Sequence, residues 1–261
     1  MTTEVIHGEA LSVMRDLPAA CADACITDLP YGITSCKWDA VIPFAPMWAE
    51  LKRVMKPNAA ILLFGSQPFS SALVMSNPQM FRHEWIWIKN RGSNFANTVR
   101  EPMKEHEAVL MFSQGKWTYN KQMQERTGAG AARVEYNVAF RSKSENYREF
   151  EGRETNTLSQ LRVPSSWQKF NTDTSGVHPT VKPVELLRYL IRTYTNEGDT
   201  VLDFTCGSGT TGVACAIEGR GFLGIEKEIK YVEAARRRIR EALHHGTLFA
   251  SAGSVGASPK R

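Results

Sequence analysis

The 261-residue chain has few cysteines and no long apolar segment. Its five cysteines form no disulfide framework, and no Cys-His pair lies near Cys21 and Cys25 to complete a zinc set. No apolar run approaches the roughly 20 residues that span a bilayer, and the first ten residues, MTTEVIHGEA, lack the pattern of a signal peptide. We therefore expect a cytoplasmic protein without a membrane anchor or a metal site.

What the chain does contain fits one fairly large globular domain that carries an inserted lobe. Hydrophobic residues make up 42% of it and charged residues 23%, with a net charge of +5. An excess of positive charge permits a polyanionic partner but does not require one.

The hydrophobic pattern alternates between strand and helix along most of the chain. We expect strands to end near His7 and to cover 24–28, 59–65, 84–90 and 106–113, with helices near 10–17, 43–56, 68–78, 183–195 and 229–243. Pro57 and Asn58 are expected to stop the second helix. The loop over 91–105 is long enough to be functional.

Residues 115–176 differ from this pattern. Apolar periodicity fades there, and ten Lys and Arg residues against six Glu residues lie between 115 and 170, interleaved with aromatic residues. This texture predicts a target-recognition insertion over 115–176 between two halves of one domain, 1–114 and 177–245, with a disordered tail over 246–261. A plain solvated surface remains the alternative, because the six acids dilute the positive charge.

A glycine turn, Gly207-Ser208-Gly209-Thr210-Thr211-Gly212, follows a predicted strand and opens a predicted helix. Glu226 ends the next strand, 19 residues after Gly207. Glycines allow a ligand close to the backbone, and a carboxylate at the second strand end can accept the hydrogens of both ribose hydroxyls. The pattern fits either NAD or S-adenosylmethionine.

The position of this turn helps to choose between the two cofactors. Only 35 residues follow Glu226, too few for the rest of a doubly wound sheet, so the missing strands must come from 1–113. An ordinary NAD domain begins with its glycine turn, and the order here is a circular permutation of that plan.

Three separated segments carry a family resemblance. TDLPYG at 27–32 resembles the (D/N/S)-P-P-(Y/F) motif of amino-group methyltransferases that act on DNA bases, and DFTCGSGTT at 203–211 resembles their cofactor motif. HPTVKP at 178–183 resembles the segment before that motif in the β arrangement of the family. IHGEAL and FLGIEKE also match. Leu29 replaces a proline, and Phe204 and Thr205 stand where Pro and Phe are usual.

The resemblance implies an α/β, Rossmann-like S-adenosylmethionine-dependent methyltransferase fold with a mixed, circularly permuted sheet. It also implies a site-specific enzyme, typical of restriction-modification and phage-type systems of bacterial origin, that methylates adenine N6 in double-stranded DNA. The Asp28 carboxylate and the Leu29 carbonyl would hold the amine, Pro30 would fix Leu29, and Tyr31 would stack on a base flipped out of the duplex. None of the cysteines is needed as a nucleophile.

The remaining site residues follow from the motifs and from the loops beside them. S-adenosylmethionine would be bound by Glu9, Ala10, the Asp28 backbone, Thr180, Lys182, Asp203, Thr205, Gly207, Ser208, Gly209, Thr210 and Glu226. The displaced DNA strand would be held by Lys37, Trp38, Arg91, Asn94 and Arg100, for which an ordinary surface role is an equal alternative.

Several alternatives stay open at this point. Asp at the first motif position favours adenine, whereas cytosine-N4 enzymes more often carry Ser there. An NAD-dependent oxidoreductase would reuse the glycine turn, and a DNA-binding protein without activity is a third reading. The resemblance allows a homodimer and association with the nucleoid, and the recognition sequence is not readable from the chain.

Overall fold

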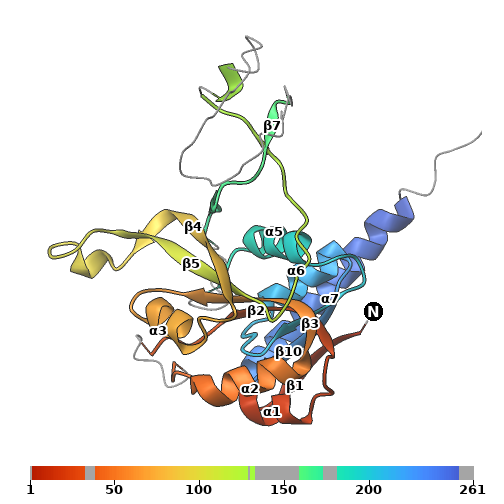
Figure 1. Cartoon of the computed structure of the whole chain (residues 1–261). Coiled ribbons are helices and arrows are strands. Elements are labelled where there is room, and N and C mark those ends of the chain that lie inside the picture. Colours follow the sequence, from red (N-terminus) through yellow and green to blue (C-terminus); the bar gives the residue numbers. More distant parts are fainter. Residues whose placement is uncertain (1, 33–38, 129, 133–158, 173–180, 253–261) are drawn as a thin grey trace, which may run out of the picture. The chain divides into compact units, whose positions relative to one another are not determined.

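The structure is a computed structural model that describes residues 2–32, 39–128, 130–132, 159–172 and 181–252 (Figure 1). It divides into two compact units, Met1–Asn120 with Ser166–Arg261, and Lys121–Ser165. The smaller unit lies inside the insertion predicted over 115–176 and contains the strand pair β6 (Gln124–Glu125) and β7 (Leu161–Arg162). Across the described ranges, no helix has the length and apolar character needed to cross a bilayer.

The larger unit is built on one mixed sheet of eight strands in the order β1-β10-β9-β2-β3-β5-β4-β8. The strands are β1 (Thr3–His7), β2 (Ala22–Asp28), β3 (Met55–Gly65), β4 (Phe81–Ser93), β5 (Lys104–Phe112), β8 (Trp167–Lys169), β9 (Thr200–Asp203) and β10 (Gly221–Glu226). The five strands from β1 to β3 are parallel, while β5 runs antiparallel to β3 and to β4. The strands of the glycine turn thus lie between strands from the N-terminal part of the chain, as the sequence required.

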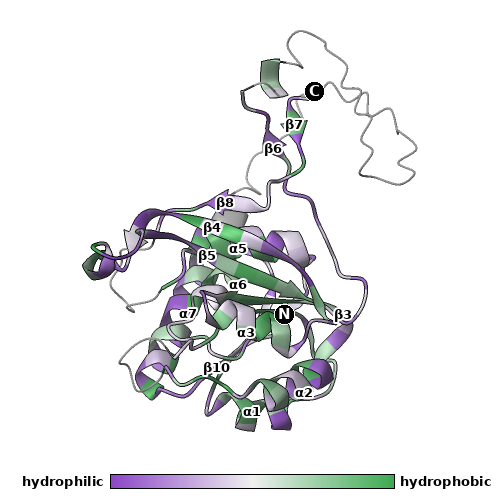
Figure 2. Cartoon of the chain, turned by 60° about the vertical axis from the view of Figure 1, so that its left-hand side comes forward, coloured by the Kyte–Doolittle hydropathy of each residue, from purple (hydrophilic) through white to green (hydrophobic). Residues whose placement is uncertain are grey.

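Helices cover both faces of this sheet. On one face lie α1 (Ala10–Asp16), α2 (Phe44–Val54) and α3 (Phe69–Ser76), and on the other lie α5 (Val184–Tyr194), α6 (Thr210–Glu218) and α7 (Ile229–Ala252). Because successive strand residues point to opposite faces, Leu62 packs in the core under α5 and Leu63 in the core under α2. Figure 2 shows the central parts of β4 and β5 in the hydrophobic colour. Burial on both faces explains the near-continuous apolar runs of the strands.

The parallel strands place polar residues at one edge of the sheet. β2 ends at Asp28, β9 at Asp203 and β10 at Glu226, and Glu9 follows the end of β1 as the N-cap of α1. The carboxyl ends of parallel strands are the usual site of ligand binding in doubly wound sheets. The fold therefore brings the motif at 27–32 and the motif at 203–211 to the same edge.

The structure corrects one predicted boundary in the first half of the chain. α2 ends at Val54, and the chain enters β3 at Met55 with no intervening loop, so Pro57 and Asn58 lie within a strand and do not terminate the helix. Both residues are exposed, and the pairing of β2 with β3 shifts register between Ala22 and Ala24. A proline is tolerated at such an irregularity because no ladder hydrogen bond is needed from it.

Two further elements are longer than expected. The predicted loop over 91–105 is the end of a hairpin, because β4 continues to Ser93 and β5 begins at Lys104, which leaves a short tip that contains one 3₁₀ turn, Phe95–Asn97. Helix α7 continues to Ala252, so 246–252, expected in the tail, are helical, and 253–261 lie outside the described residues. Charged and polar residues in the hairpin, and Gly246 with the small residues that end α7, hid these elements from a reading of hydrophobic period.

Candidate active site

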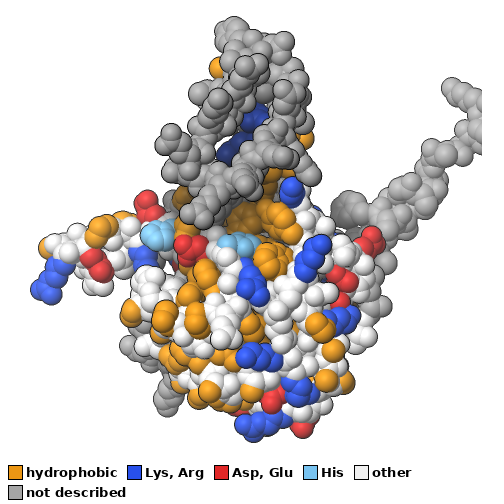
Figure 3. All heavy atoms as spheres, viewed as in Figure 1, with side chains coloured by type: hydrophobic (Ala, Val, Ile, Leu, Met, Phe, Trp, Pro, Cys, Tyr) orange, Lys and Arg blue, Asp and Glu red, His pale blue; other side chains and the backbone are white. Residues whose placement is uncertain are grey.

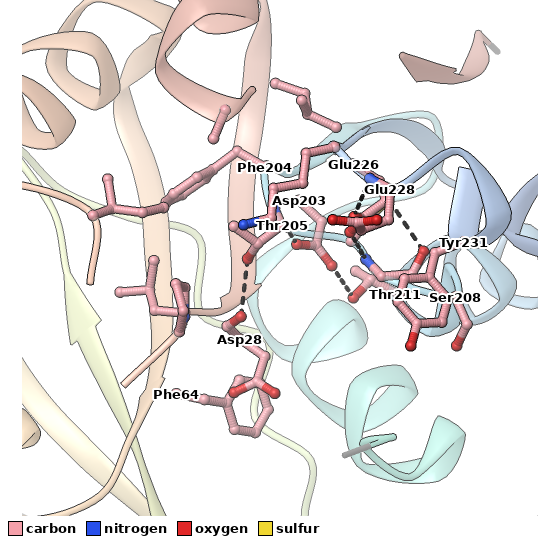
Figure 4. A pocket seen from close by; sticks show the side chains of 18 of the residues that line it. Asp28, Phe64, Asp203, Phe204, Thr205, Ser208, Thr211, Glu226, Glu228 and Tyr231 are labelled. Carbon is pink, nitrogen blue, oxygen red and sulfur yellow. Dashed lines mark hydrogen bonds between the residues drawn. The ribbon is translucent and has the colours of Figure 1, made fainter. Parts of the chain in front are cut away.

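A cavity of about 370 Å³ opens at the carboxyl ends of the parallel strands (Figure 4). This volume is within the range of roughly 300–1,000 Å³ that is usual for cofactor and ligand pockets. Twelve residues predicted from the sequence line it, namely Glu9, Ala10, Asp28, Leu29, Pro30, Lys182, Asp203, Thr205, Gly207, Ser208, Thr210 and Glu226. The two motifs, which lie more than 170 residues apart in the chain, therefore share one pocket.

The glycine turn has the backbone geometry that its sequence predicted. Gly207 has a φ of +51° and Gly209 a φ of +77°, in the left-handed region that favours glycine. A Cβ on Gly209 would lie 2.6 Å from the Cβ of Ala235 on α7, so this glycine also permits the turn to pack against that helix. Arg238, on the same helix, donates to the Ser208 carbonyl at 2.7 Å and to the Thr210 hydroxyl at 3.1 Å. The turn is held from outside by α7 and is open towards the cavity.

Glu226 is tied to the turn that it faces. Its Oε2 accepts from the Gly207 backbone N–H at 2.9 Å, and its Oε1 accepts from the Glu228 backbone N–H at 2.8 Å. A carboxylate has about four lone-pair sites, so each oxygen can still accept one hydroxyl hydrogen. Fixed by two backbone donors, the carboxylate is oriented to receive a pair of adjacent hydroxyls.

Asp203 is a buried carboxylate surrounded by hydroxyl groups. Thr211 donates to its Oδ2 at 2.6 Å, while Thr27 donates to Oδ1 at 3.2 Å and the Thr205 backbone N–H to the same oxygen at 3.3 Å. Burial raises the pKa of Asp203 to about 7, although these three donors act to lower it. These hydrogen bonds join the ends of β2 and β9 to the start of α6, so Asp203 organises the turn between β9 and α6.

Thr205 connects the two motifs directly. Its hydroxyl donates to the backbone carbonyl of Asp28 at 2.9 Å (Figure 4). The sequence departs from the usual family motif at this position, where Phe is common. The structure shows what the hydroxyl does instead, because it ties the end of β9 to the end of β2.

The Asp28 carboxylate has a donor on each oxygen. The Tyr31 hydroxyl donates to Oδ1 at 2.7 Å, and the Lys182 ammonium lies 2.6 Å from Oδ2. Asp28 is also 27% exposed in its side chain and lines the cavity. The carboxylate is thus held in one orientation and still faces the pocket, where its remaining lone pairs can accept hydrogens from a bound amine.

Some predicted residues take other positions. Tyr31 does not line the cavity: its ring packs against Phe69, with centroids 5.1 Å apart, and its hydroxyl points to Asp28. Gly209 is likewise absent from the lining and contacts α7. The ammonium of Lys182 is paired with carboxylates of the protein. Lys37, Trp38 and Thr180 lie outside the described residues.

Of the predicted DNA-binding residues, the three that the structure describes, Arg91, Asn94 and Arg100, belong to the β4–β5 hairpin and do not line the pocket. Arg91 and Arg100 are exposed near its tip. Asn94 uses both ends of its amide inside the hairpin, because Nδ2 donates to Glu101 at 2.9 Å and Oδ1 accepts from the Lys104 backbone N–H at 2.9 Å. The two arginines are therefore available to a partner, whereas the Asn94 amide shapes the tip.

Sequence reasoning missed several residues of the site. Tyr231 and Glu228 at the start of α7 and Pro43 before α2 line the cavity. Glu107 and Lys89 reach Asp28 indirectly, through Lys182. No motif marks these positions. Lys89 and Glu107 lie in the polar stretches KNR of β4 and KEHE of β5, where the sequence does not distinguish them from surface charges.

The fold and the site together define a Rossmann-like, nucleotide-cofactor domain of the methyltransferase type, in which an acidic strand-end motif faces the cofactor turn. A sequence model of the family described as DNA methylase matches residues 22–237, which is most of the chain. The protein belongs to this DNA methylase family.

Individual relatives agree with this assignment. The protein is 27% identical over 260 residues to DNA adenine methyltransferase YhdJ of Escherichia coli (strain K12), with 92% of this chain and 84% of that protein covered. It resembles the crystal structure of the M1.HpyAVI–SAM complex with a TM-score of 0.60 and 26% identity, over 91% of this chain and 100% of that one. The PvuII cytosine-N4-specific DNA methyltransferase shares the fold, with a TM-score of 0.64 and 14% identity, over 94% of this chain and 93% of that one.

Proposed function

We propose that this protein is a site-specific DNA methyltransferase that moves the methyl group of S-adenosylmethionine to N6 of an adenine flipped out of double-stranded DNA. The observation that carries the proposal is the shared pocket, in which the Asp28 carboxylate and the turn at Gly207 are joined by the Thr205 hydroxyl. The methyl donor and its acceptor must meet within a few ångströms, and this pocket brings their two motifs together.

The cofactor fits the residues that line the pocket. Glu226 would accept the ribose hydroxyls, and the open backbone at Gly207 would lie against the methionine part. Glu9 and Ala10, at the start of α1, would lie near the adenine. S-adenosylmethionine supplies a methyl group on a positively charged sulfur, which leaves as a neutral thioether when the methyl is transferred.

The acceptor amine needs help because its lone pair is delocalised into the ring of the base. The Asp28 carboxylate and the Leu29 carbonyl would accept its two hydrogens and turn the lone pair towards the methyl carbon. The new N–C bond forms as the C–S bond breaks, and one proton then leaves the nitrogen, with Asp28 as the nearest carboxylate to receive it. Orientation and electrostatics supply the rate, and no covalent enzyme intermediate is required.

Adenine N6 is favoured over cytosine N4 by two observations. The first motif position is Asp28, and a relative that covers most of the chain is named a DNA adenine methyltransferase. Cytosine N4 is the second candidate, since the acceptor chemistry is the same and a cytosine-N4-specific enzyme shares the fold.

Mass spectrometry of nucleosides from treated DNA separates the two candidates. Unmethylated genomic DNA, incubated with the protein and S-adenosylmethionine, is expected to yield N6-methyldeoxyadenosine, and N4-methyldeoxycytidine would establish the second candidate. The Asp28→Ala variant is expected to bind S-adenosylmethionine and to transfer no methyl. Near-normal turnover by that variant would refute the role of Asp28.

The proposal also covers the site that is modified, the association with the nucleoid and assembly as a homodimer. Long-read sequencing of DNA from cells that express the protein would report the modified base together with its surrounding site. Binding to DNA would associate the protein with the nucleoid of a bacterial or phage-infected cell. Sedimentation of the protein with and without DNA would decide whether it acts as a homodimer.

A further inference from the structure

Four charged side chains of alternating sign form a chain that ends at Asp28. The Lys89 ammonium hydrogen-bonds Glu107 Oε1, the Lys182 ammonium lies 3.3 Å from Glu107 Oε2, and the same ammonium lies 2.6 Å from Asp28 Oδ2. We refer to these four residues as the ion chain. Asp28 is its only member assigned to the acceptor amine above.

The ion chain is assembled from four elements that are distant in sequence. Lys89 lies on β4, Glu107 on the antiparallel neighbour β5, Lys182 just before α5, and Asp28 at the end of β2. Aromatic rings support both ammonium groups: Lys89 lies 5.0 Å from the Trp87 ring centroid and Lys182 lies 5.1 Å from that of Phe64. The side-chain exposures are 8% for Lys89, 14% for Glu107, 10% for Lys182 and 27% for Asp28. The end at Asp28 is therefore the most open, and it faces the cavity.

Stability alone is a poor explanation for such a chain. Removing charges from water costs several kcal/mol per ion, and apolar side chains of similar volume are often as stabilising as a buried ion pair. Burial acts to lower the pKa of Lys182, but Asp28 and Glu107 outweigh it and raise that pKa. Burial acts to raise the pKa of Glu107, but Lys182 and Lys89 outweigh it and lower that pKa. Lys182 and Glu107 are thus held in their charged forms, at a fixed geometry.

We propose that Glu107 is a positioning residue for methyl transfer, which fixes the Lys182 ammonium so that Lys182 in turn orients the Asp28 carboxylate. The inference rests on the proposed function of Asp28 and extends it to a strand outside the motifs. Glu107 is not among the residues that line the cavity, so its effect passes through Lys182.

The chemical reason is that the Lys182 ammonium is held by two carboxylates at once. An ammonium has three N–H donors; here it donates to Asp28 Oδ2 at 2.6 Å and lies in ion-pair range of Glu107 Oε2 at 3.3 Å. Without the charge of Glu107, only Asp28 would hold the ammonium, and the orientation of the Asp28 carboxylate would depend on the Tyr31 hydroxyl at Oδ1. The acceptor amine would then meet a carboxylate of variable orientation, which slows chemistry more than it weakens cofactor binding, because displacements of ~1 Å can cost about 100-fold in rate.

The test compares Glu107→Gln with Glu105→Gln, a matched change of an exposed glutamate two residues away on β5. Glu107→Gln is expected to lower kcat for DNA methylation about 10- to 100-fold, with the Kd for S-adenosylmethionine by calorimetry within about twofold of wild type. Glu105→Gln is expected to match wild type in both. In a Lys182→Gln background, adding Glu107→Gln is expected to change kcat by less than about twofold, since its effect passes through Lys182.

A second variant covers the case in which Glu107→Gln fails to fold. The double variant Glu107→Gln/Lys89→Gln removes one charge of each sign and leaves the Lys182–Asp28 pair balanced. It is expected to fold and to show the same loss of kcat. A kcat within about twofold of wild type in either folded variant, or failure of both to fold, would overturn the inference. An inactive wild-type protein would overturn the proposed function and the role of Glu107 together. An active wild-type protein with equally active Glu107 variants would overturn the role of Glu107 alone.

Discussion

At the scale of single residues, threonine hydroxyl groups hold Asp28 and Asp203, the acids at the ends of the neighbouring strands β2 and β9. Thr27 and Thr211 donate to Asp203, and Thr205 donates to the carbonyl of Asp28. Threonine is compact and donates one hydrogen, so it satisfies a buried acceptor without adding a charge. These contacts fix the end of β9 against the end of β2.

The pKa of Asp203, raised to about 7, predicts a pH dependence of stability. The folded state binds this proton more tightly than the unfolded state, whose Asp has a pKa of ~3.9, so the stabilisation is complete below about pH 4 and is lost as pH rises through about 7. Asp203→Asn removes this titration, and Thr211 can reverse its hydroxyl to accept from the amide. The free energy of unfolding of the variant minus that of wild type should rise by on the order of 2–4 kcal/mol from pH 4 to pH 8 in urea titrations. A difference that stays constant with pH would refute the assignment.

Thr205 gives the second prediction at this scale. Thr205→Val keeps the shape and loses the donor to the Asp28 carbonyl, which is worth about 1 kcal/mol, or about fivefold in kcat if the bond persists in the transition state. Thr205→Ser keeps the hydroxyl and is expected to stay near wild type. Single-turnover methylation assays of the two variants measure the difference. Equal rates for Val and Ser would show that the hydrogen bond has no part in the reaction.

Twelve of the residues that line the pocket were predictable because they belong to motifs with fixed spacing. Asp28, Gly207 and Glu226 were found from strand ends and a glycine turn, and the structure places all three on the cavity. Glu107 was not predictable, since it belongs to the charged stretch KEHE at the start of β5 and no local pattern reports that its carboxylate meets Lys182. Tyr31 was assigned to base stacking, which stays a prediction, while its observed contacts are Asp28 and Phe69.

At the scale of elements, the β4–β5 hairpin projects from the larger unit (Figure 1). Figure 3 shows it at the left with apolar, basic and acidic side chains at its end, whereas Lys and Arg side chains elsewhere on this face are scattered. Phe95 is 79% exposed and Val99 is 91% exposed at the tip. Its strands were predicted, but its length was not, because the alternation of buried and exposed residues fades beyond Ile88.

The exposed arginines of the hairpin are expected to make electrostatic contacts with DNA, which their removal would eliminate. Arg91→Ala and Arg100→Ala should each weaken DNA binding at all sequences and lower the salt-dependence slope of log Kd by about 1, as expected for one lost phosphate contact. Lys52→Ala, which removes an exposed cation on α2, serves as the control and should leave the slope unchanged. Fluorescence anisotropy over a salt series provides the slopes. Unchanged slopes for both arginine variants would place the DNA elsewhere.

At the scale of the whole molecule, the family and the fold were predictable from the order of three motifs, and both are confirmed. The strands beside the glycine turn are too few to form a sheet, so the sheet must also take strands from the N-terminal part of the chain. The observed order places β9 and β10 between β1 and β2, as this requires. The circular permutation as an evolutionary origin, the phage origin and the homodimer stay predictions. The edges of the insertion were less predictable, because Trp167–Lys169 pair with β4 and belong to the main sheet.

The division into two units predicts separable functions. Replacing Lys121–Ser165 with a short Gly-Ser linker should remove the preference for one DNA site and leave the affinity for S-adenosylmethionine within about threefold of wild type, because the cavity is lined by the larger unit alone. Calorimetry and sequencing of methylated DNA measure the two quantities. A shortened protein that still methylates only the original site would show that recognition lies outside this unit.

The central claim is that one pocket holds the methyl donor between the turn at Gly207 and the carboxylate of Asp28. A crystal structure of the protein with S-adenosylmethionine tests it most directly. We expect the ribose hydroxyls within hydrogen-bonding distance of Glu226, about 2.5–3.0 Å, and the methyl group directed towards the space beside Asp28 and Leu29. A cofactor bound outside this cavity, or with its methyl group turned away from Asp28, would contradict the account.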